Sequence, residues 1–125
     1  MPPVIITLGR DRSLNDALCA LLSTRDIHCE SYEIGSLAHE ELVALRPNLV
    51  LLHLTHRKDP ALEILAAVRG DQRLQQTKVM VLTTESCSQV LDLTLAHAVS
   101  IVPWQMDVLE REIHHMLAGR DRQTE

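Results

Sequence analysis

PNLVLLHL, residues 47–54, contains the most apolar run of the chain. From Leu49 to Leu54, every residue except His53 is a leucine or a valine. A strand that is covered by helices on both faces of a parallel sheet is continuously apolar, whereas a strand with one wet face alternates. The stretch Leu49–Leu54 therefore predicts the central strand of a parallel sheet.

Four further short runs on either side of this stretch predict strands. They are Val4–Leu8, Ile27–Glu33, Val79–Thr83 and Val99–Val102. Apolar residues at helical spacing predict helices between and after the strands, at residues 13–24, 37–45, 60–70, 86–97 and 105–118. Strands that alternate with helices of about a dozen residues indicate an α/β fold with a parallel sheet and right-handed crossovers.

Residues that favour helix ends set the expected boundaries. Ser13 is the expected N-cap of the first helix, and Ser86 is that of the fourth. Pro60 fits the first position of the third helix, and Gly70 is expected to close it.

Length and charge limit the classes of function. The 125 residues fit one domain, expected at residues 1–119, followed by a polar tail or the start of a linker at residues 120–125. The formal charge of −5 argues against direct binding of nucleic acid or an anionic membrane. No apolar run is long enough to span a membrane, and the N-terminus lacks the features of a secretion signal. We therefore expect a cytoplasmic protein.

Three cysteines, Cys19, Cys29 and Cys87, are odd in number and widely spaced in the sequence. We expect reduced thiols rather than a disulfide framework. Cys19 falls near the apolar face of its predicted helix, where a free cysteine usually acts as a small buried hydrophobic residue.

Metal and nucleotide sites are not expected. His53 and His56, like the adjacent pair His114 and His115, have no cysteine within the spacing of a structural zinc site. Gly9 follows a strand and precedes a helix, but neither of the glycine-rich nucleotide motifs is present. The sequence therefore predicts no cofactor.

Four local motifs, in order, resemble those of response-regulator receivers of the CheY-like family. They are Gly9-Arg10-Asp11-Arg12-Ser13-Leu14, Pro47-Asn48-Leu49-Val50-Leu51-Leu52, Val81-Leu82-Thr83, and Val102-Pro103-Trp104 where receivers carry Lys-Pro-Phe. The resemblance covers nearly the whole chain. It implies a flavodoxin-like (βα)5 three-layer sandwich with a five-stranded parallel sheet of order 2-1-3-4-5.

Receivers that signal by phosphorylation use five side chains at the carboxyl ends of their strands. An aspartate accepts the phosphoryl group, two acids help to hold Mg²⁺, a hydroxyl contacts the phosphoryl group and a lysine neutralises charge. In this sequence the corresponding positions are His53 for the acceptor, Gly9 and Arg10 for the acids, Thr83 for the hydroxyl and Val102 for the lysine. The switch aromatic of such receivers corresponds to Val99.

The resemblance therefore implies a pseudo-receiver that is neither phosphorylated nor an enzyme. No acid occurs between Glu41 and Asp59, so no local realignment restores the acceptor. Only Asp11 remains near the metal position, and one carboxylate seldom holds Mg²⁺ without substrate phosphates. We interpret His53 as a residue that fills the degenerate pocket, rather than as a phosphoryl acceptor on nitrogen.

Receivers commonly meet partners or second copies through helix 4, strand 5 and helix 5. The corresponding apolar residues are Leu93, Val99 and Trp104, although Trp104 could instead fold over the sheet edge. Their polar rim would include Asp107, Glu110 and Arg111. The resemblance also implies a cis bond before Pro103, and a DNA-binding or other output domain as a separate unit.

An alternative reading keeps the strand ends functional. Open α/β sheets bind ligands at the carboxyl ends of their strands. A small ligand or anion could be held there by Arg10, His53 and Thr83, with Gly9 and Asp11 beside them. The two readings predict different consequences for changes at Arg10 and His53.

Overall fold

A computed structural model describes residues 3–24, 26–54, 60–84, 96–101 and 106–118. The strands are β1 (Val4–Gly9), β2 (His28–Glu33), β3 (Leu49–Leu54), β4 (Lys78–Thr83) and β5 (Ala98–Ile101). The helices are α1 (Arg12–Leu22), α2 (His39–Leu45), α3 (Ala61–Gly70), the 3-10 turn η1 (Gln72–Leu74) and α5 (Met106–Leu117).

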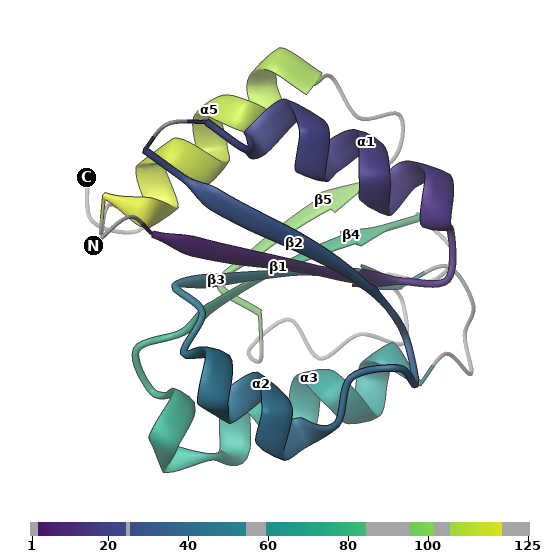
Figure 1. The fold of residues 1–125 in the computed structure, drawn as a ribbon, viewed down its shortest axis with the longest axis vertical. Helices are drawn as coiled ribbons and strands as arrows, with labels where there is room; N and C mark the ends of the chain where they lie inside the picture. The colour runs from purple at the N-terminus through teal and green to yellow at the C-terminus, as the bar shows by residue number, and fades with distance from the viewer. Residues whose placement is uncertain (1–2, 25, 55–59, 85–95, 102–105, 119–125) are drawn as a thin grey trace.

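The five strands form one parallel sheet of order β2-β1-β3-β4-β5. This is the flavodoxin-like order predicted from the sequence. Figure 1 shows α1 and α5 over one face of the sheet and α2 and α3 over the other, which makes three layers. None of the described helices is long and apolar enough to cross a membrane.

Strand β3 lies at the centre of both halves of the core. All six of its residues are buried, as the apolar run predicted. Val50 and Leu52 pack with residues of α2 and α3, whereas Leu49 and Leu51 pack with residues of α1 and α5. Both faces of the strand are therefore covered by apolar side chains, which explains why its sequence does not alternate.

The start of α1 differs from the prediction. Asp11, not Ser13, is the N-cap, and its Oδ1 accepts a hydrogen bond of 3.1 Å from the Leu14 N–H. In the first turn of this helix, Asn15 is buried, and its Nδ2 donates to the carbonyls of Gly9 and Tyr32 at 3.1 Å. These two bonds join α1 to β1 and β2, and this tertiary contact outweighs the capping preference of Ser13.

Other element ends also moved from the predicted positions. Pro60 is the N-cap of α3 rather than its first helical residue, and Gly70 is the last residue inside that helix. His97 was predicted to be helical, but its N–H donates to the Val79 carbonyl at 2.9 Å, next to β5. Residues 86–95 of that predicted helix, with Ser86 and Cys87, lie outside the described residues.

Candidate functional site at the carboxyl ends of the strands

Gly9 and His53 are in direct contact at the ends of β1 and β3. His53 is only 1% exposed. A Cβ added to Gly9 would lie 2.5 Å from Nδ1, 2.7 Å from Cγ and 2.9 Å from Cβ of His53. All three distances are too short for real Cβ contacts, so the imidazole occupies the space of a side chain at position 9.

Thr83 lies near the same edge, but its side chain points to the other face of the sheet. In the β3–β4 register, His53 pairs with Leu82, and Thr83 pairs with Leu54. Paired residues share a face and consecutive residues alternate, so His53 and Thr83 project in opposite directions. The Thr83 hydroxyl donates to the buried Leu54 carbonyl oxygen at 2.8 Å.

Arg10 and Asp11 lie between the end of β1 and the start of α1. Both side chains are exposed, and the Asp11 carboxylate is used as the cap of α1. Of the residues expected at this site, the structure thus joins Gly9 to His53 and separates them from Thr83. Val102 lies outside the described residues.

A cavity of about 520 Å³ lies next to Arg10, between the end of β1 and the helices α2 and α3. Its lining is mainly apolar and includes Leu8, Ile34, Leu37, Leu42 and Ile64. Neither His53 nor Thr83 lines it. The arginine and the buried histidine of the alternative reading therefore do not face one common cavity.

A network of charged side chains joins α2 to the turn η1 that follows α3. Arg73 donates two hydrogen bonds to Glu40, at 2.9 and 2.8 Å, and also bonds Asp71 at 2.8 Å. Asp71 also contacts His39 Nε2 at 2.8 Å. Hydrogen bonds from Arg73, and then from His39, hold the pKa of the Asp71 carboxyl below its ordinary value. Hydrogen bonds from Arg73 likewise lower the pKa of Glu40.

The β5–α5 side carries exposed apolar residues that sequence reasoning did not single out. Ile101 ends the edge strand and is 44% exposed, and Val108 in the first turn of α5 is 38% exposed. A signal existed for Val108, because it falls outside the apolar stripe of the predicted helix 105–118, which consists of Met106, Leu109, Ile113, Met116 and Leu117. The order 2-1-3-4-5 also predicted an edge position for the strand that contains Ile101.

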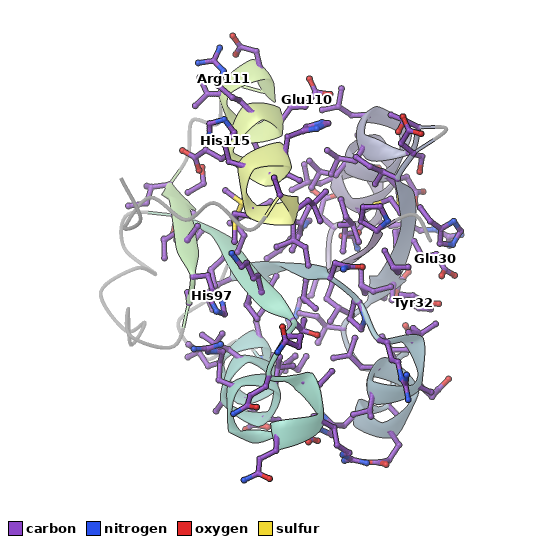
Figure 2. The ribbon with its side chains drawn as sticks, turned by 90° about the vertical axis from the view of Figure 1, so that its left-hand side faces the viewer. Glu30, Tyr32, His97, Glu110, Arg111 and His115 are labelled. Atoms are coloured by element: carbon purple, nitrogen blue, oxygen red, sulfur yellow. The ribbon has the colours of Figure 1, made fainter. Side chains whose placement is uncertain are left out.

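The predicted partner residues are only partly visible. Val99 is half-buried and packs against the core on the α2–α3 side. Asp107 and Arg111 are exposed and Glu110 is half-buried; Figure 2 shows Glu110 and Arg111 on α5, at the opposite end of the molecule from α2 and α3. Leu93, Pro103 and Trp104 lie outside the described residues. Within the described part of the chain, no three His, Cys, Asp or Glu side chains gather as a metal site would require.

Comparison with known proteins supports the fold alone. No protein-family model matches the sequence, and no curated protein sequence matches it. Among solved structures, the response regulator TrrA of Thermotoga maritima, in complex with Mg²⁺ and BeF, matches with a TM-score of 0.77. The chain has the fold of a response-regulator receiver.

The receiver match extends over almost the full length of both chains, although sequence identity is low. For TrrA the identity is 16%, with 91% of this chain and 98% of that chain covered. CheY4 of Vibrio cholerae matches at a TM-score of 0.73 and 16% identity, covering 93% of this chain and 99% of that one. A DNA-binding response regulator of the LuxR family from Staphylococcus aureus matches at 0.72 and 19%, covering 92% and 98%.

Proposed function

We propose that this chain is a pseudo-receiver: a module of a two-component-type signalling or transcription protein that acts by protein contact and not by aspartyl phosphorylation. The contact between Gly9 and the buried His53 carries the proposal. The proposal includes a cytoplasmic location and no catalytic activity of its own.

The residues at the strand ends do not fit magnesium. Mg²⁺ requires oxygen ligands in near-octahedral geometry. At the position of one acid, no side chain fits beside the His53 ring, and at the next position Arg10 places a cation. The carboxylate of Asp11 is already used to cap α1. We therefore derive no phosphoryl-transfer step for this chain.

The β5–α5 side is the surface that we propose for contact, with a second copy of the chain as the partner. Exposed apolar residues with a polar rim mark interaction sites. Here Ile101 at the end of β5 and Val108 in α5 are exposed, and Asp107 and Arg111 of opposite charge lie in α5 beside Val108. Ile101 pairs with Thr83 and so projects toward the α2–α3 side, whereas α5 covers the other face (Figure 1), so Ile101 and Val108 flank the β5 edge of the sheet. A two-fold interface places the same patch on both copies, so Asp107 of one copy can meet Arg111 of the other.

The contact surface is tested by sedimentation of the wild type and of variants over a concentration series. We expect Ile101→Lys and Val108→Lys to weaken self-association by roughly tenfold or more, because each would bury a charge where the second copy covers the β5 edge. Leu21→Lys is the matched control, since Leu21 is a similarly exposed apolar residue on α1. A wild type that stays monomeric, or equal effects of all three changes, would overturn the dimer.

Phosphorylation is tested separately. The chain is incubated with Mg²⁺ and either beryllofluoride or acetyl phosphate, and intact mass and amide spectra are recorded. TrrA, whose structure holds Mg²⁺ and BeF, is the positive control. We expect no phosphoryl adduct and no spectral change, and an adduct at any residue of the strand ends would refute the pseudo-receiver.

A second candidate is a small-ligand sensor, favoured by the cavity of about 520 Å³ beside Arg10. Its mainly apolar lining would suit an apolar ligand with one anionic group placed at the Arg10 guanidinium and away from Glu63, which also lines the cavity, as does His39. Arg10→Ala and His53→Ala separate the two proposals, since the cavity is lined by Arg10 but not by His53. If signalling by the protein that contains this module depends on Arg10 and not on Ile101 or Val108, the sensor is favoured.

A further inference from the structure

Helix α1 is held against the edge strand β2 by a row of side-chain contacts. Asn15 Nδ2 donates to the Tyr32 carbonyl at 3.1 Å, and Ser31 Oγ donates to Asp16 Oδ1 at 3.0 Å. One turn further along α1, Cys19 Sγ lies 3.0 Å from Cys29 Sγ. The two sulfurs are therefore placed by a helix and a strand whose relative position other bonds already fix.

The two cysteines are free thiols in a sheltered position. Cys29 is buried and Cys19 is half-buried. Both are reduced, as the sequence predicted, but the β1–α1–β2 crossover brings residues 19 and 29 together although they are widely spaced in the sequence. The S–S bond of a disulfide is about 2.05 Å long, so closure requires the sulfurs to approach by only about 1 Å.

We propose that Cys19 and Cys29 are a dithiol modification site that closes to an intramolecular disulfide between α1 and β2 under oxidising conditions. The oxidant is a low-molecular-weight disulfide such as oxidised glutathione. The Cys19 thiolate attacks one of its sulfurs and releases one thiolate, which leaves a mixed disulfide on Cys19. The Cys29 thiolate then attacks Cys19 Sγ and releases the second, so two protein thiols become one disulfide and two small thiols form.

Cys19 is the entry point because it is the more exposed of the two sulfurs. Burial, followed by the charges of Asp16 and Glu30, raises the pKa of Cys19, although the contact with Cys29 opposes this. Burial raises the pKa of the Cys29 thiol still further. Figure 2 shows Glu30 at the outer edge of β2. Thiolate formation is therefore disfavoured, so closure is slow near neutral pH and accelerates as the pH rises.

The same features make the closed form hard to reduce. A reducing thiol reaches Cys19 Sγ more readily than the buried Cys29 Sγ, and its attack must expel the Cys29 thiolate. A thiol of high pKa is a poor leaving group in thiol–disulfide exchange. The pair therefore suits a persistent clamp rather than a rapid peroxide sensor.

The test uses the full chain with Cys87→Ser, treated with oxidised glutathione, alkylated and mapped by peptide mass spectrometry. We expect a loss of about 2 Da, for two hydrogens, in one linked peptide pair containing Cys19 and Cys29. The clamp closes a short loop, so Tm should rise by roughly 5–10 °C and return to its initial value with dithiothreitol. In Cys29→Ser, Cys19 should remain as the mixed disulfide.

Two outcomes would overturn the proposal. One is a Cys87→Ser chain that keeps both thiols, or carries two separate glutathione adducts, after prolonged treatment above pH 8. The other is a crosslink that forms between chains and increases with protein concentration. Because the mapping uses a chain with both cysteines intact, the result does not depend on whether Cys29→Ser folds.

Discussion

The hydroxyl of Thr83 donates a 2.8 Å hydrogen bond to the carbonyl oxygen of Leu54, across the β3–β4 register at the buried end of the sheet. Thr83 is the residue that the resemblance matches to the hydroxyl position of receivers, and its hydroxyl is bonded to the neighbouring strand. The bond gives the residue a structural role that does not require a phosphoryl group.

Replacing Thr83 with valine should therefore affect stability rather than signalling. The change keeps the shape and removes one buried hydrogen bond, so we expect a loss of about 1–2 kcal/mol in the free energy of unfolding. Thr83→Ser keeps the hydroxyl and is the matched control for its hydrogen bond. Urea denaturation measures both, and a loss for Thr83→Ser as large as that for Thr83→Val would remove the role assigned to the hydroxyl.

The contact between Gly9 and His53 predicts a coupled pair of mutations. Gly9→Ala places a methyl group against the ring and should cost about 1–3 kcal/mol. In a His53→Ala background, the contacts with Nδ1 and Cγ disappear and the one at 2.9 Å with Cβ remains. The cost of Gly9→Ala should therefore fall there without vanishing.

Gly70→Ala is the control for this cycle. Gly70 lies in α3 with no atom within 4 Å of an added Cβ, so alanine there should be neutral or stabilise by up to about 1 kcal/mol. Additive effects of Gly9→Ala and His53→Ala in denaturation experiments would contradict the close contact.

Two residues near the N-terminus of α1, Asp11 and Ser13, are of types that cap helices, and substitutions distinguish which of them caps this one. Asp11→Ala should lower the free energy of unfolding by about 0.5–2 kcal/mol, since it removes the acceptor for the Leu14 N–H. Ser13→Ala should have little effect, because Ser13 lies exposed inside the first turn. Thermal and urea unfolding of both variants check this, and the reverse ranking would restore Ser13 as the cap.

The network of Arg73, Asp71 and Glu40 predicts a dependence of stability on acid. The folded-state pKa of both carboxyls is lowered, so their stabilising contribution is complete above the ordinary carboxyl pKa of about 4. It is lost as the pH falls below that value through the folded pKa. The wild type should therefore lose stability as the pH falls below about 4.

Asp71→Asn should reduce this loss of stability at low pH, because it removes the carboxyl whose pKa is lowered more. Glu63→Gln is the control, since Glu63 lies exposed on α3. Urea midpoints measured from pH 6 to pH 2.5 report the slope for each variant. An unchanged acid slope in Asp71→Asn would mean that other carboxyls cause the acid sensitivity.

Much of the fold could be predicted because the strongest patterns are also the most buried. Leu49–Leu54 has one apolar face toward each helical layer, and its position fixed the middle of the sheet. Helix ends were less predictable, because Asp11 and Ser13 are both good caps. The choice between them depends on the distant partner of Asn15, the Tyr32 carbonyl.

The site shows the same division. The sequence placed Gly9 and His53 at neighbouring strand ends, but their contact depends on the backbone spacing between β1 and β3. The contact of the two thiols depends on how α1 packs against β2. The contact of Arg73 with Glu40 depends on how the turn η1 lies beside α2. Residues 40 and 73 are 33 positions apart, and no periodicity links them.

The packing of Gly9 against His53 also constrains how this chain could change over evolutionary time. An acid at position 9 is incompatible with the ring at position 53, so removal of the ring must come first. Even then, the ends of β1 and β3 must separate slightly to clear the remaining Cβ. Acidic chemistry at position 9 would thus need ordered substitutions, and the earlier ones bring no chemical gain until the last is made.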